Sequence, residues 1–457
     1  MKKSQLSEHQ QEVFQQITDK IKENLLSKIV NIPLFARFLS LTGAAGTGKS
    51  YLTAAIVDEI DNFLPVGQYD IYVTAPTHKA VTVMKEMLFY SYDIGVKCCT
   101  IHSFLSLKQS YNYETGAEKF AVDRSKDKIN RASLLIVDES SMVSNELFEF
   151  IAEVVKKGYV NTVLFIGDSY QLLPVNQSSL NDVFRLRNQF KLTQIVRQAK
   201  DSQIIQLSTE IRTKISTNDY VDFREIFDEI DKNSEDIKFF NNKREFIKDF
   251  YKNENWQDED KIITSFTNNE VDNFNNAIRR RFWREQDNDA PKFLLPNDKI
   301  RFKKPSFDIN SDNQKILFQN GEEVTIEKAE LIFDEKLRFY YWDCLATGRP
   351  LSSFRVVDPY SMEKCNEILN DYAYFARTSN YPENLNWWDK YFKLRDSFSD
   401  VQYTFASTIH KLQGSSYKTV YIDLESLLNN RNISKDSMFR LVYVAITRAK
   451  SKVKILL

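Results

Sequence analysis

The segment Gly43–Ser50, GAAGTGKS, constrains this chain most, because its G-x-x-x-x-G-K-S spacing belongs to one local fold. An apolar run at Arg37–Thr42 predicts a strand before it, and Leu52, Ile56 and Ile60 predict one face of a helix after it. A strand, a glycine-rich loop and a helix form the unit that holds nucleotide phosphates on backbone N–H groups. The chain is therefore predicted to contain an α/β domain.

We assign this loop to ATP, with Mg²⁺ as the accompanying metal. The Lys49 ammonium is expected to contact the β- and γ-phosphates, and the Ser50 hydroxyl to hold the metal. The start of the following helix adds a favourable field for anions. The predicted nucleotide contacts in the loop are Gly43, Ala44, Ala45, Gly46, Thr47, Gly48, Lys49 and Ser50. The alternative is a glycine-rich turn that matches by chance.

Two later apolar runs also end in polar side chains. LLIVDESSM ends at Asp138 and Glu139, and an acidic pair at the tip of a buried strand needs a cation. Asp138 is predicted to hold Mg²⁺, and Glu139 to orient or deprotonate the attacking water. TVLFIGDSYQLLPV places Asp168 and Gln171 where they can sense a γ-phosphate. The alternatives are a helix cap at Asp138 or Ser140 and an ordinary strand exit at Asp168.

Two arginines lie far from the loop in sequence. Arg197 follows the short run LTQIV. Arg448 follows LVYVAIT, whose apolar periodicity predicts a buried helix. Phosphoryl transfer spreads negative charge over the γ-phosphate oxygens, and arginine stabilises that charge. Both are predicted catalytic residues of a site assembled between two domains. The alternative for each is a surface salt bridge.

Length and composition limit the number of domains and the class of protein. The 457 residues predict two to four domains, and 42% hydrophobic with 27% charged residues is typical of globular proteins. No apolar run approaches the roughly 20 residues of a membrane span, and the N-terminus resembles no signal peptide. We therefore expect a cytoplasmic protein with reduced cysteines and no membrane partner. A net charge of −1 means that any nucleic acid must bind in a local groove.

Together, these segments resemble the superfamily 1 helicases, in the family's order and across nearly the whole chain. LSEHQQEVF resembles the glutamine motif, with Gln10 as the implied adenine contact. The remaining matching segments are GAAGTGKS, TAPTHKA, TIHSFL, VDESSM, GDSYQLLPV, LTQIVRQ, STIHKLQGSSYKTVYID and VYVAITRAK. TIHSFL and TIHKLQG are similar to the 5′→3′, RecD-like branch, and the length and LTQIVRQ wording are most similar to its Dda-like members from T-even phages. Ser50 and Ala44 replace a commoner Thr and Pro without loss of the chemistry.

The resemblance implies an ATP-dependent helicase that moves 5′→3′ on single-stranded DNA and unwinds a fork duplex. It also implies work as a monomer, alongside single-strand-binding, replication or recombination proteins. The strand is expected to meet helix starts, hydroxyls and three histidines. The predicted DNA contacts are Pro76, Thr77, His78, Thr100, His102, Thr264, Asn268, Thr408, His410 and Gln413. Gln413 and Gly414 are expected to link the DNA and nucleotide sites, with Gly414 on the nucleotide side.

The implied fold is α/β, with two RecA-like P-loop domains. The first spans 1–190 and carries a β-hairpin pin at about 103–131, where Tyr111, Tyr113 and Phe120 are candidates for base stacking or for packing. The second spans 191–286 and 401–457. Residues 287–400 form a β-rich accessory domain with a small, Src-homology-3-like barrel.

Basic and aromatic residues outside these motifs receive modest assignments. Arg279, Arg280 and Arg281 are predicted to form a solvated face. Lys299, Arg301, Lys303 and Lys304 face either DNA or solvent at a strand edge. Trp387 and Trp388 are predicted to pack inside the accessory domain.

Three rival functions stay open at this point. One is a translocase, or the motor subunit of a nuclease complex, that does not itself unwind duplex. Another is a P-loop kinase or metabolic ATPase, which leaves Arg448 and the repeated Thr-Ile-His segments unexplained. The third is a structural role for a bound nucleotide.

Overall fold

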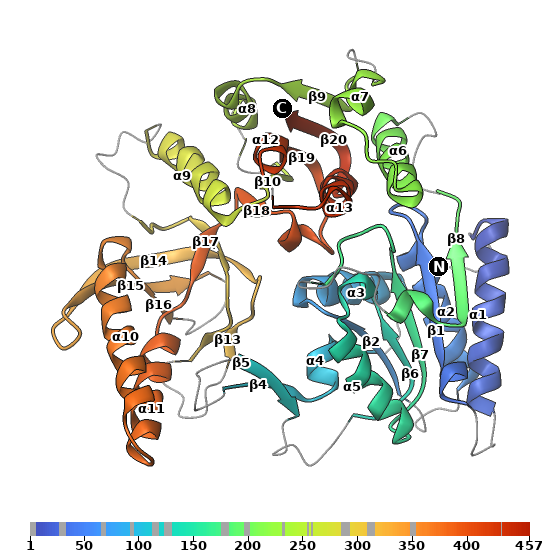
Figure 1. Cartoon of the computed structure of the whole chain (residues 1–457), viewed down its shortest axis with the longest axis horizontal. Coiled ribbons are helices and arrows are strands. Elements are labelled where there is room, and N and C mark those ends of the chain that lie inside the picture. Colours follow the sequence, from blue (N-terminus) through green and yellow to red (C-terminus); the bar gives the residue numbers. More distant parts are fainter. Residues whose placement is uncertain are drawn as a thin grey trace. The chain divides into compact units, whose positions relative to one another are not determined.

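The computed structural model (Figure 1) divides into two compact units, each described here by itself. The two-sheet unit holds Met1–Lys108, Val122–Asn268 and Ser407–Leu457, and the accessory unit holds Gln109–Ala121 and Asn269–Ala406. The structure describes residues 6–26, 33–64, 70–91, 96–111, 118–122, 130–174, 182–195, 202–230, 234–253, 256, 259–284, 293–308, 316–347, 353–430 and 432–457.

The first sheet of the two-sheet unit has six strands, and all its neighbouring strands are parallel. Their order is β3 (Lys97–Thr100), β2 (Ile71–Ala75), β6 (Ala132–Val137), β7 (Val160–Gly167), β1 (Phe38–Gly43) and β8 (Asn188–Leu192). The associated helices are α1 (Glu8–Leu26), α2 (Lys49–Phe63), α3 (His78–Ser91), α4 (Ile101–Phe104) and α5 (Asn145–Lys156), with short 3-10 turns η2 (Leu34–Arg37), η3 (Ser140–Met142) and η4 (Asp182–Arg185).

Alternation along the strands builds two cores, one on each face of this sheet. Leu134 and Ile136 of β6 pack with α1, α2 and α3, whereas Leu135 and Val137 pack with α4 and α5. Because successive side chains point to opposite faces, a strand buried on both sides reads as a continuous apolar run. This explains why the run LLIV reaches the carboxylates that follow it without a polar break.

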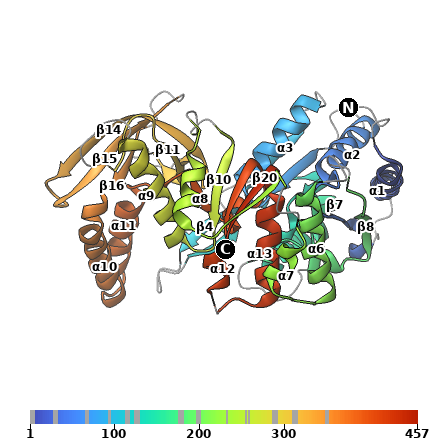
Figure 2. The ribbon, with the colours of Figure 1, turned by 90° about the horizontal axis from the view of Figure 1, so that it is seen from above.

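The second sheet of this unit contains β18 (Ala406–Thr408), β10 (Lys261–Ser265), β19 (Tyr417–Asp423), β20 (Ala449–Leu456) and β9 (Ile237–Phe240), in that order. The β10–β19, β19–β20 and β20–β9 pairs are parallel. Its helices are α6 (Gln203–Thr217), α7 (Phe223–Asp228), α8 (Lys243–Phe250), α12 (Leu424–Leu428) and α13 (Lys435–Thr447), with the 3-10 turn η6 (His410–Leu412). Helices α6 and α13 pack side by side (Figure 2), and α13 is almost wholly buried. The prediction of two RecA-like sheets is confirmed.

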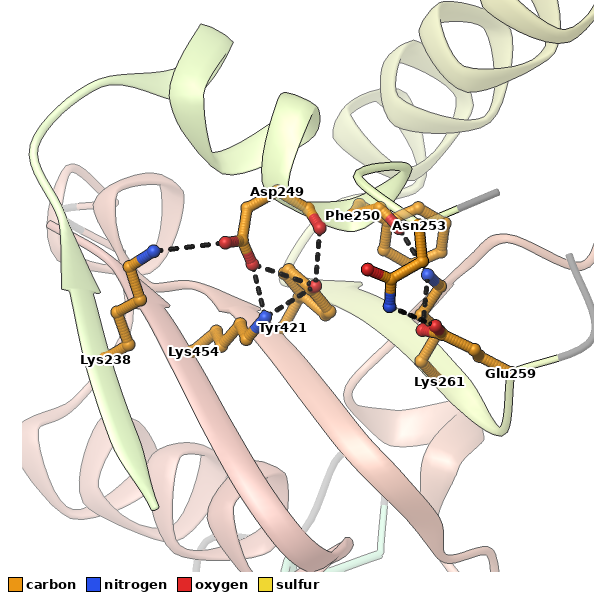
Figure 3. Close-up of polar contacts among 8 residues, drawn as sticks. All are labelled: Lys238, Asp249, Phe250, Asn253, Glu259, Lys261, Tyr421 and Lys454. Atoms are coloured by element: carbon orange, nitrogen blue, oxygen red, sulfur yellow. Dashed lines mark hydrogen bonds and ion pairs between the residues drawn. The ribbon is translucent and has the colours of Figure 1, made fainter. Parts of the chain in front are cut away.

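A polar network links α8 to strands of the second sheet (Figure 3). The Tyr421 hydroxyl of β19 donates to Asp249 Oδ2 at 3.0 Å and accepts from Lys454 Nζ at 3.0 Å. Lys238 Nζ donates to Asp249 Oδ1 at 3.1 Å, and Lys454 also pairs with this carboxylate. Although burial raises the pKa of Asp249, the hydrogen bonds from Lys454 and Lys238 hold it below its ordinary value. These contacts join α8 to three strands.

The accessory unit contains a five-stranded sheet in the order β16 (Ser353–Val357), β15 (Phe339–Ala346), β14 (Glu323–Asp334), β11 (Lys299–Phe302) and β17 (Val401–Tyr403), with antiparallel neighbours. A second pair joins β12 (Ser306–Phe307) and β13 (Ile316–Phe318). Its helices are α9 (Asn268–Arg284), α10 (Met362–Thr378) and α11 (Glu383–Asp396), with the turn η5 (Pro359–Ser361). Trp388 is buried, as predicted, and Trp387 stacks on Phe375 with centroids 4.9 Å apart.

Two features bear on the predicted domain limits. The segment from Asn269 to Arg284, which we placed in the second RecA-like domain, groups here with the accessory unit. Strands β4 (Leu107–Tyr111) and β5 (Glu118–Val122) pair as a two-stranded sheet inside the segment assigned to the pin. The side chains of Tyr111, Tyr113 and Phe120 lie outside the described part of the structure.

The solvated face predicted for the arginines of α9 is wrong at Arg279. This residue is 5% exposed, and its guanidinium pairs with Asp298 at 2.8 Å and lies over the Tyr403 ring. Arg280 and Arg281 are exposed, as expected. Arg301 is likewise buried and bonds Glu323 Oε1 at 3.0 Å, so a role for Arg301 on DNA is not supported. Lys303 pairs with Asp400 at 2.8 Å.

Arg279→Ala should destabilise the accessory unit by about 3–5 kcal/mol, because it leaves the Asp298 carboxylate buried without its partner. Denaturant unfolding followed by tryptophan fluorescence measures this loss. Arg280→Ala, on the same helix, is the matched control and should stay within about 0.5 kcal/mol of the unsubstituted chain. Equal unfolding midpoints for the two variants would contradict the assignment.

Candidate nucleotide site and nucleic-acid interface

The loop between β1 and α2 has the geometry of a phosphate-binding loop. Gly46 and Gly48 adopt φ angles of 82° and 80°, a left-handed conformation that glycine enters at little cost. Lys49 Nζ donates to the carbonyls of Gly43 at 2.7 Å and Ala44 at 3.0 Å. The Thr47 hydroxyl donates to the Ala44 carbonyl at 2.9 Å. The predicted loop residues therefore lie together at the start of α2.

Gln10 reaches this loop from α1. Its buried Nε2 donates to the Thr47 carbonyl at 3.0 Å, and its Oε1 accepts from the Ser7 N–H at 3.0 Å. A Cβ atom built on Gly48 would lie 2.5 Å from Gln10 Nε2. Gly48 thus serves both the turn of the loop and the approach of Gln10.

Asp138 and Glu139 follow β6, beside the phosphate loop. Burial and the neighbouring Glu139 raise the pKa of Asp138 to about 7, and Lys49 opposes part of this shift. Glu139 adopts a positive φ of 49°, which is uncommon outside glycine and favours a functional over a capping reading of this pair. A Cβ atom on Gly167, at the end of β7, would lie 2.5 Å from Ser140 Oγ. The ends of β6 and β7 therefore meet closely.

A divalent cation fits this corner of the site. Ser50 begins the first turn of α2 with an exposed side chain, and the Asp138–Glu139 pair gains from a positive partner. Within the described ranges, no group of three or more His, Cys, Asp or Glu side chains forms a metal cluster. Two protein oxygens with phosphate and water oxygens suit Mg²⁺, which retains waters and rarely uses an all-protein cage.

Helix α13 contributes two side chains that the sequence analysis missed. The Tyr443 hydroxyl donates to Asp168 Oδ2 at 2.7 Å and accepts from the Ala45 N–H at 3.3 Å. Arg440 Nη1 donates to the carbonyls of Ser169 at 2.7 Å and Gln171 at 3.1 Å. A tyrosine and an arginine three residues apart in an apolar helical run were the available signal, since buried polar groups need partners.

The two predicted catalytic arginines have different outcomes. Arg448 directly follows α13 and is 6% exposed, and its guanidinium donates to the carbonyls of Val444 at 3.3 Å and Ser415 at 3.4 Å. Arg197 lies outside the described residues.

Arg212 of α6 was not predicted, yet it lies over the Tyr170 ring at 5.9 Å. A cavity of about 270 Å³ is bordered by Gly43, Tyr170, Lys191 and Arg212, among others.

Gly414 joins the second sheet to the first. Its φ is 73°, and a Cβ atom here would lie 3.3 Å from Ala80 Cβ and 3.8 Å from Glu139 Oε1. Lys79, beside Ala80 on α3, donates to the Tyr417 hydroxyl at 3.1 Å. A side chain at position 414 would therefore meet both the proposed catalytic carboxylate and the helix that begins at His78.

The predicted DNA contacts fall at element ends of the two-sheet unit. Pro76 and Thr77 follow β2, and the Thr77 hydroxyl accepts from the Ala80 N–H at the start of α3. Thr100 caps α4 by accepting from the Ser103 N–H at 3.2 Å. His102 and His410 lie in α4 and η6, and the His410 ring is 6.1 Å from the Phe266 ring.

Of the remaining predicted contacts, Asn268 is exposed, and the other three are buried. Thr264 is fully buried, so direct contact between its side chain and DNA is not supported. Thr408 and Gln413 are 6% and 7% exposed, and Asn268 begins α9. Among the described residues, Gln171 Oε1, Gln413 Nε2 and Ser415 Oγ are buried without a hydrogen-bond partner. An unsatisfied buried group costs about 1–3 kcal/mol, so each calls for a water or ligand partner.

Two family models match the chain. Residues 34–230 match a family described as an AAA domain, and residues 403–456 match the UvrD-like helicase C-terminal domain. The ATP-dependent DNA helicase dda of Enterobacteria phage T4 is 25% identical, over 97% of this chain and 98% of that protein. The chain belongs to the superfamily 1 helicases. Within them it is Dda-like, as its motifs predicted.

Two further comparisons concern the length of the chain and its fold. The uncharacterized protein R530 of Acanthamoeba polyphaga mimivirus is 24% identical, over 90% of this chain and 94% of that protein. The crystal structure of a Pif1 helicase from Bacteroides, in complex with ADP-AlF3 and ssDNA, has a TM-score of 0.50 and 15% identity. It covers 98% of this chain and 92% of that one, and it supports the fold. No helix in the described ranges is long and apolar enough to cross a membrane.

The pKa values of two histidines predict a pH dependence. Burial and His78 lower the pKa of His102, and burial lowers that of His410. Their contribution to stability is therefore fully present above the ordinary histidine pKa of about 6.5 and is lost as pH falls through the lowered values. The free energy of unfolding should drop less steeply between pH 7 and pH 5 in H102Q/H410Q than in the unsubstituted protein. His9→Gln is the control, and an unchanged slope in the double variant would contradict the prediction.

Proposed function

We propose that this helicase hydrolyses ATP to move 5′→3′ on single-stranded DNA and to unwind duplex ahead of it. One observation carries the proposal: α13 of the second sheet bonds both the phosphate loop, at Ala45, and the loop after β7, at Asp168. A nucleotide bound at that loop therefore lies beside elements of both sheets. Several relatives are named ATP-dependent DNA helicases, among them dda of phage T4.

In the proposed ATP site, each residue has a separate task. Gln10 contacts the adenine base, and Lys49 leaves the loop carbonyls to hold the β- and γ-phosphates. Glu139 orients the attacking water and accepts its proton, and Gln171 senses the γ-phosphate. When bound, Mg²⁺ held by Ser50 and Asp138 would neutralise charge on the phosphate oxygens. Arg197 and Arg448 stabilise the charge that develops on the γ-phosphate.

The proposed DNA path uses neutral and dipolar groups. Because the lowered pKa values of His102 and His410 keep these rings uncharged near pH 7, they can stack or hydrogen-bond but do not pair ionically with phosphates. Backbone N–H groups at the start of α3 are suited to a phosphate. Overall neutrality, with a net charge of −1, is consistent with such a local groove.

Movement follows from two states of the cleft between the sheets. ATP makes contacts in the closed state that it lacks in the open one, so it shifts the population toward closure. Gly414 lies so near Glu139 and Ala80 that a Cβ atom there would meet both, and this proximity is proposed to connect hydrolysis to η6 and α3, where the strand is proposed to bind. Each cycle of closing and opening would advance the strand by one step.

Lys49→Ala should lower the rate of ATP hydrolysis by about 100-fold or more, because the phosphates lose their principal cation. Binding of a fluorescent single strand should change little, since the lysine contacts no proposed DNA residue. Lys157→Ala, an exposed lysine at the end of α5, is the control. Retained turnover in the Lys49 variant would contradict the site assignment.

Duplexes with a 5′ or a 3′ single-stranded tail test direction and unwinding together. With ATP, we expect strand separation only when the tail is 5′. ATP hydrolysis stimulated by single strands without strand separation would favour a translocase, and hydrolysis that ignores DNA would favour a metabolic ATPase. Activity only on the 3′ tail would overturn the proposed polarity.

A further inference from the structure

Tyr443 of α13 has a hydroxyl with two partners from the opposite sheet. The ring is 1% exposed within the core of the second sheet. Its oxygen lies 2.7 Å from Asp168 Oδ2 and 3.3 Å from the Ala45 nitrogen. Asp168 is fully buried, and its other oxygen accepts from the Tyr170 N–H at 3.0 Å. The hydroxyl is thus a donor to a buried carboxylate and an acceptor from the phosphate loop.

These roles are fixed by protonation. Burial and the Asp168 carboxylate raise the pKa of Tyr443 well above its ordinary value, so the phenol keeps its proton. A protonated phenol has one hydrogen to donate and lone pairs to accept with. Asp168 takes the hydrogen, and the Ala45 N–H can then meet only a lone pair. The direction of both bonds is therefore set.

The Ala45 N–H has a second potential acceptor. It belongs to the phosphate loop, whose N–H groups are the donors that nucleotide phosphates use. A phosphate oxygen carries more charge than a phenol oxygen and forms the stronger hydrogen bond. A nucleotide would therefore compete with Tyr443 for this donor, while the bond to Asp168 persists.

Further contacts near Tyr443 attach the loop after β7 to α13. Arg440 lies one turn earlier on α13, donates to the Ser169 and Gln171 carbonyls, and pairs with Asp436 at 2.8 Å. Leu172 packs in the hydrophobic core of the second sheet. The loop from Asp168 to Leu172 is therefore attached to α13, although it continues from β7 of the first sheet. A shift of α13 would carry Gln171 with it.

We propose that Tyr443 is a positioning residue that couples occupancy of the phosphate loop to the position of α13, and through Arg440 to Gln171. The inference rests on the proposed ATPase function and adds a residue to it. In the free protein, the hydroxyl holds α13 on the loop. With nucleotide bound, the released hydroxyl keeps Asp168 in place while α13 and its arginine adjust.

Tyr443→Phe tests this directly, because it removes one oxygen and leaves the buried ring. We expect the kcat of DNA-stimulated ATP hydrolysis to fall about 10-fold or more, as expected from misplaced catalytic groups. The KM for ATP should stay the same or fall, since the Ala45 N–H no longer has a competing acceptor. A purely structural role for the hydroxyl would not produce this split.

Tyr421→Phe is the matched control (Figure 3). Its hydroxyl also donates to a carboxylate, Asp249, in the same unit, at 3.0 Å, but it lies in the network that joins α8 to the strands. Removing the Tyr421 hydroxyl should lower the melting temperature as much as removing the Tyr443 hydroxyl does. It should leave kcat and KM unchanged. Equal kcat values for Y443F and the unsubstituted enzyme, or an equal fall in both variants, would overturn the proposal.

Two further measurements keep the outcomes separate. If Y443F does not fold, D168N is assayed instead, because asparagine retains an acceptor but not the charge; the proposal again requires a fall in kcat. Where both fold, Y443F/D168N should be no worse than the poorer single variant, since the residues act as one unit. Unsubstituted enzyme whose ATP hydrolysis is not stimulated by DNA would refute the proposed function instead, whatever the variants do.

Discussion

The attachment of α13 to the loop after β7 is the interaction on which the rest of the site depends. Arg440 and Tyr443 bond that loop at Ser169, Gln171 and Asp168. Through these bonds, a helix of the second sheet contacts the loop that carries Asp168 and Gln171 of the first sheet. Gln171 Oε1, in the loop after β7, is buried without a hydrogen-bond partner within the described structure, as expected for a group whose partner is a ligand or water.

Much of this could be predicted from the sequence because the relevant signals are local. The phosphate loop, its flanking strand and helix, and the carboxylates after β6 and β7 are fixed by short-range periodicity and glycine spacing. Gln10 was assigned through family resemblance, and the structure places it against Thr47. In each case one segment carries both the signal and the geometry.

The remainder depended on pairings between distant segments, which periodicity does not encode. The Tyr443–Asp168 bond spans 275 positions, so the local sequence around either residue does not indicate it. Arg279 was predicted to be part of a basic surface run, yet it is buried, and its ion pair with Asp298 offsets the cost of burying the charge. Thr264 was predicted to contact DNA, but it lies in β10, where every residue after Lys261 is buried. Buried polar residues were the hardest to predict, because their environment is set by partners far away in the chain.

The central claim is that the nucleotide and DNA sites are coupled, and thermodynamic linkage tests it most directly. The dissociation constant for a fluorescent single strand is measured with and without a nonhydrolysable ATP analogue, at one salt concentration. The account predicts that the analogue changes this constant by about 5-fold or more, which is the usual range of coupling between sites. Identical dissociation constants in the two conditions would contradict it.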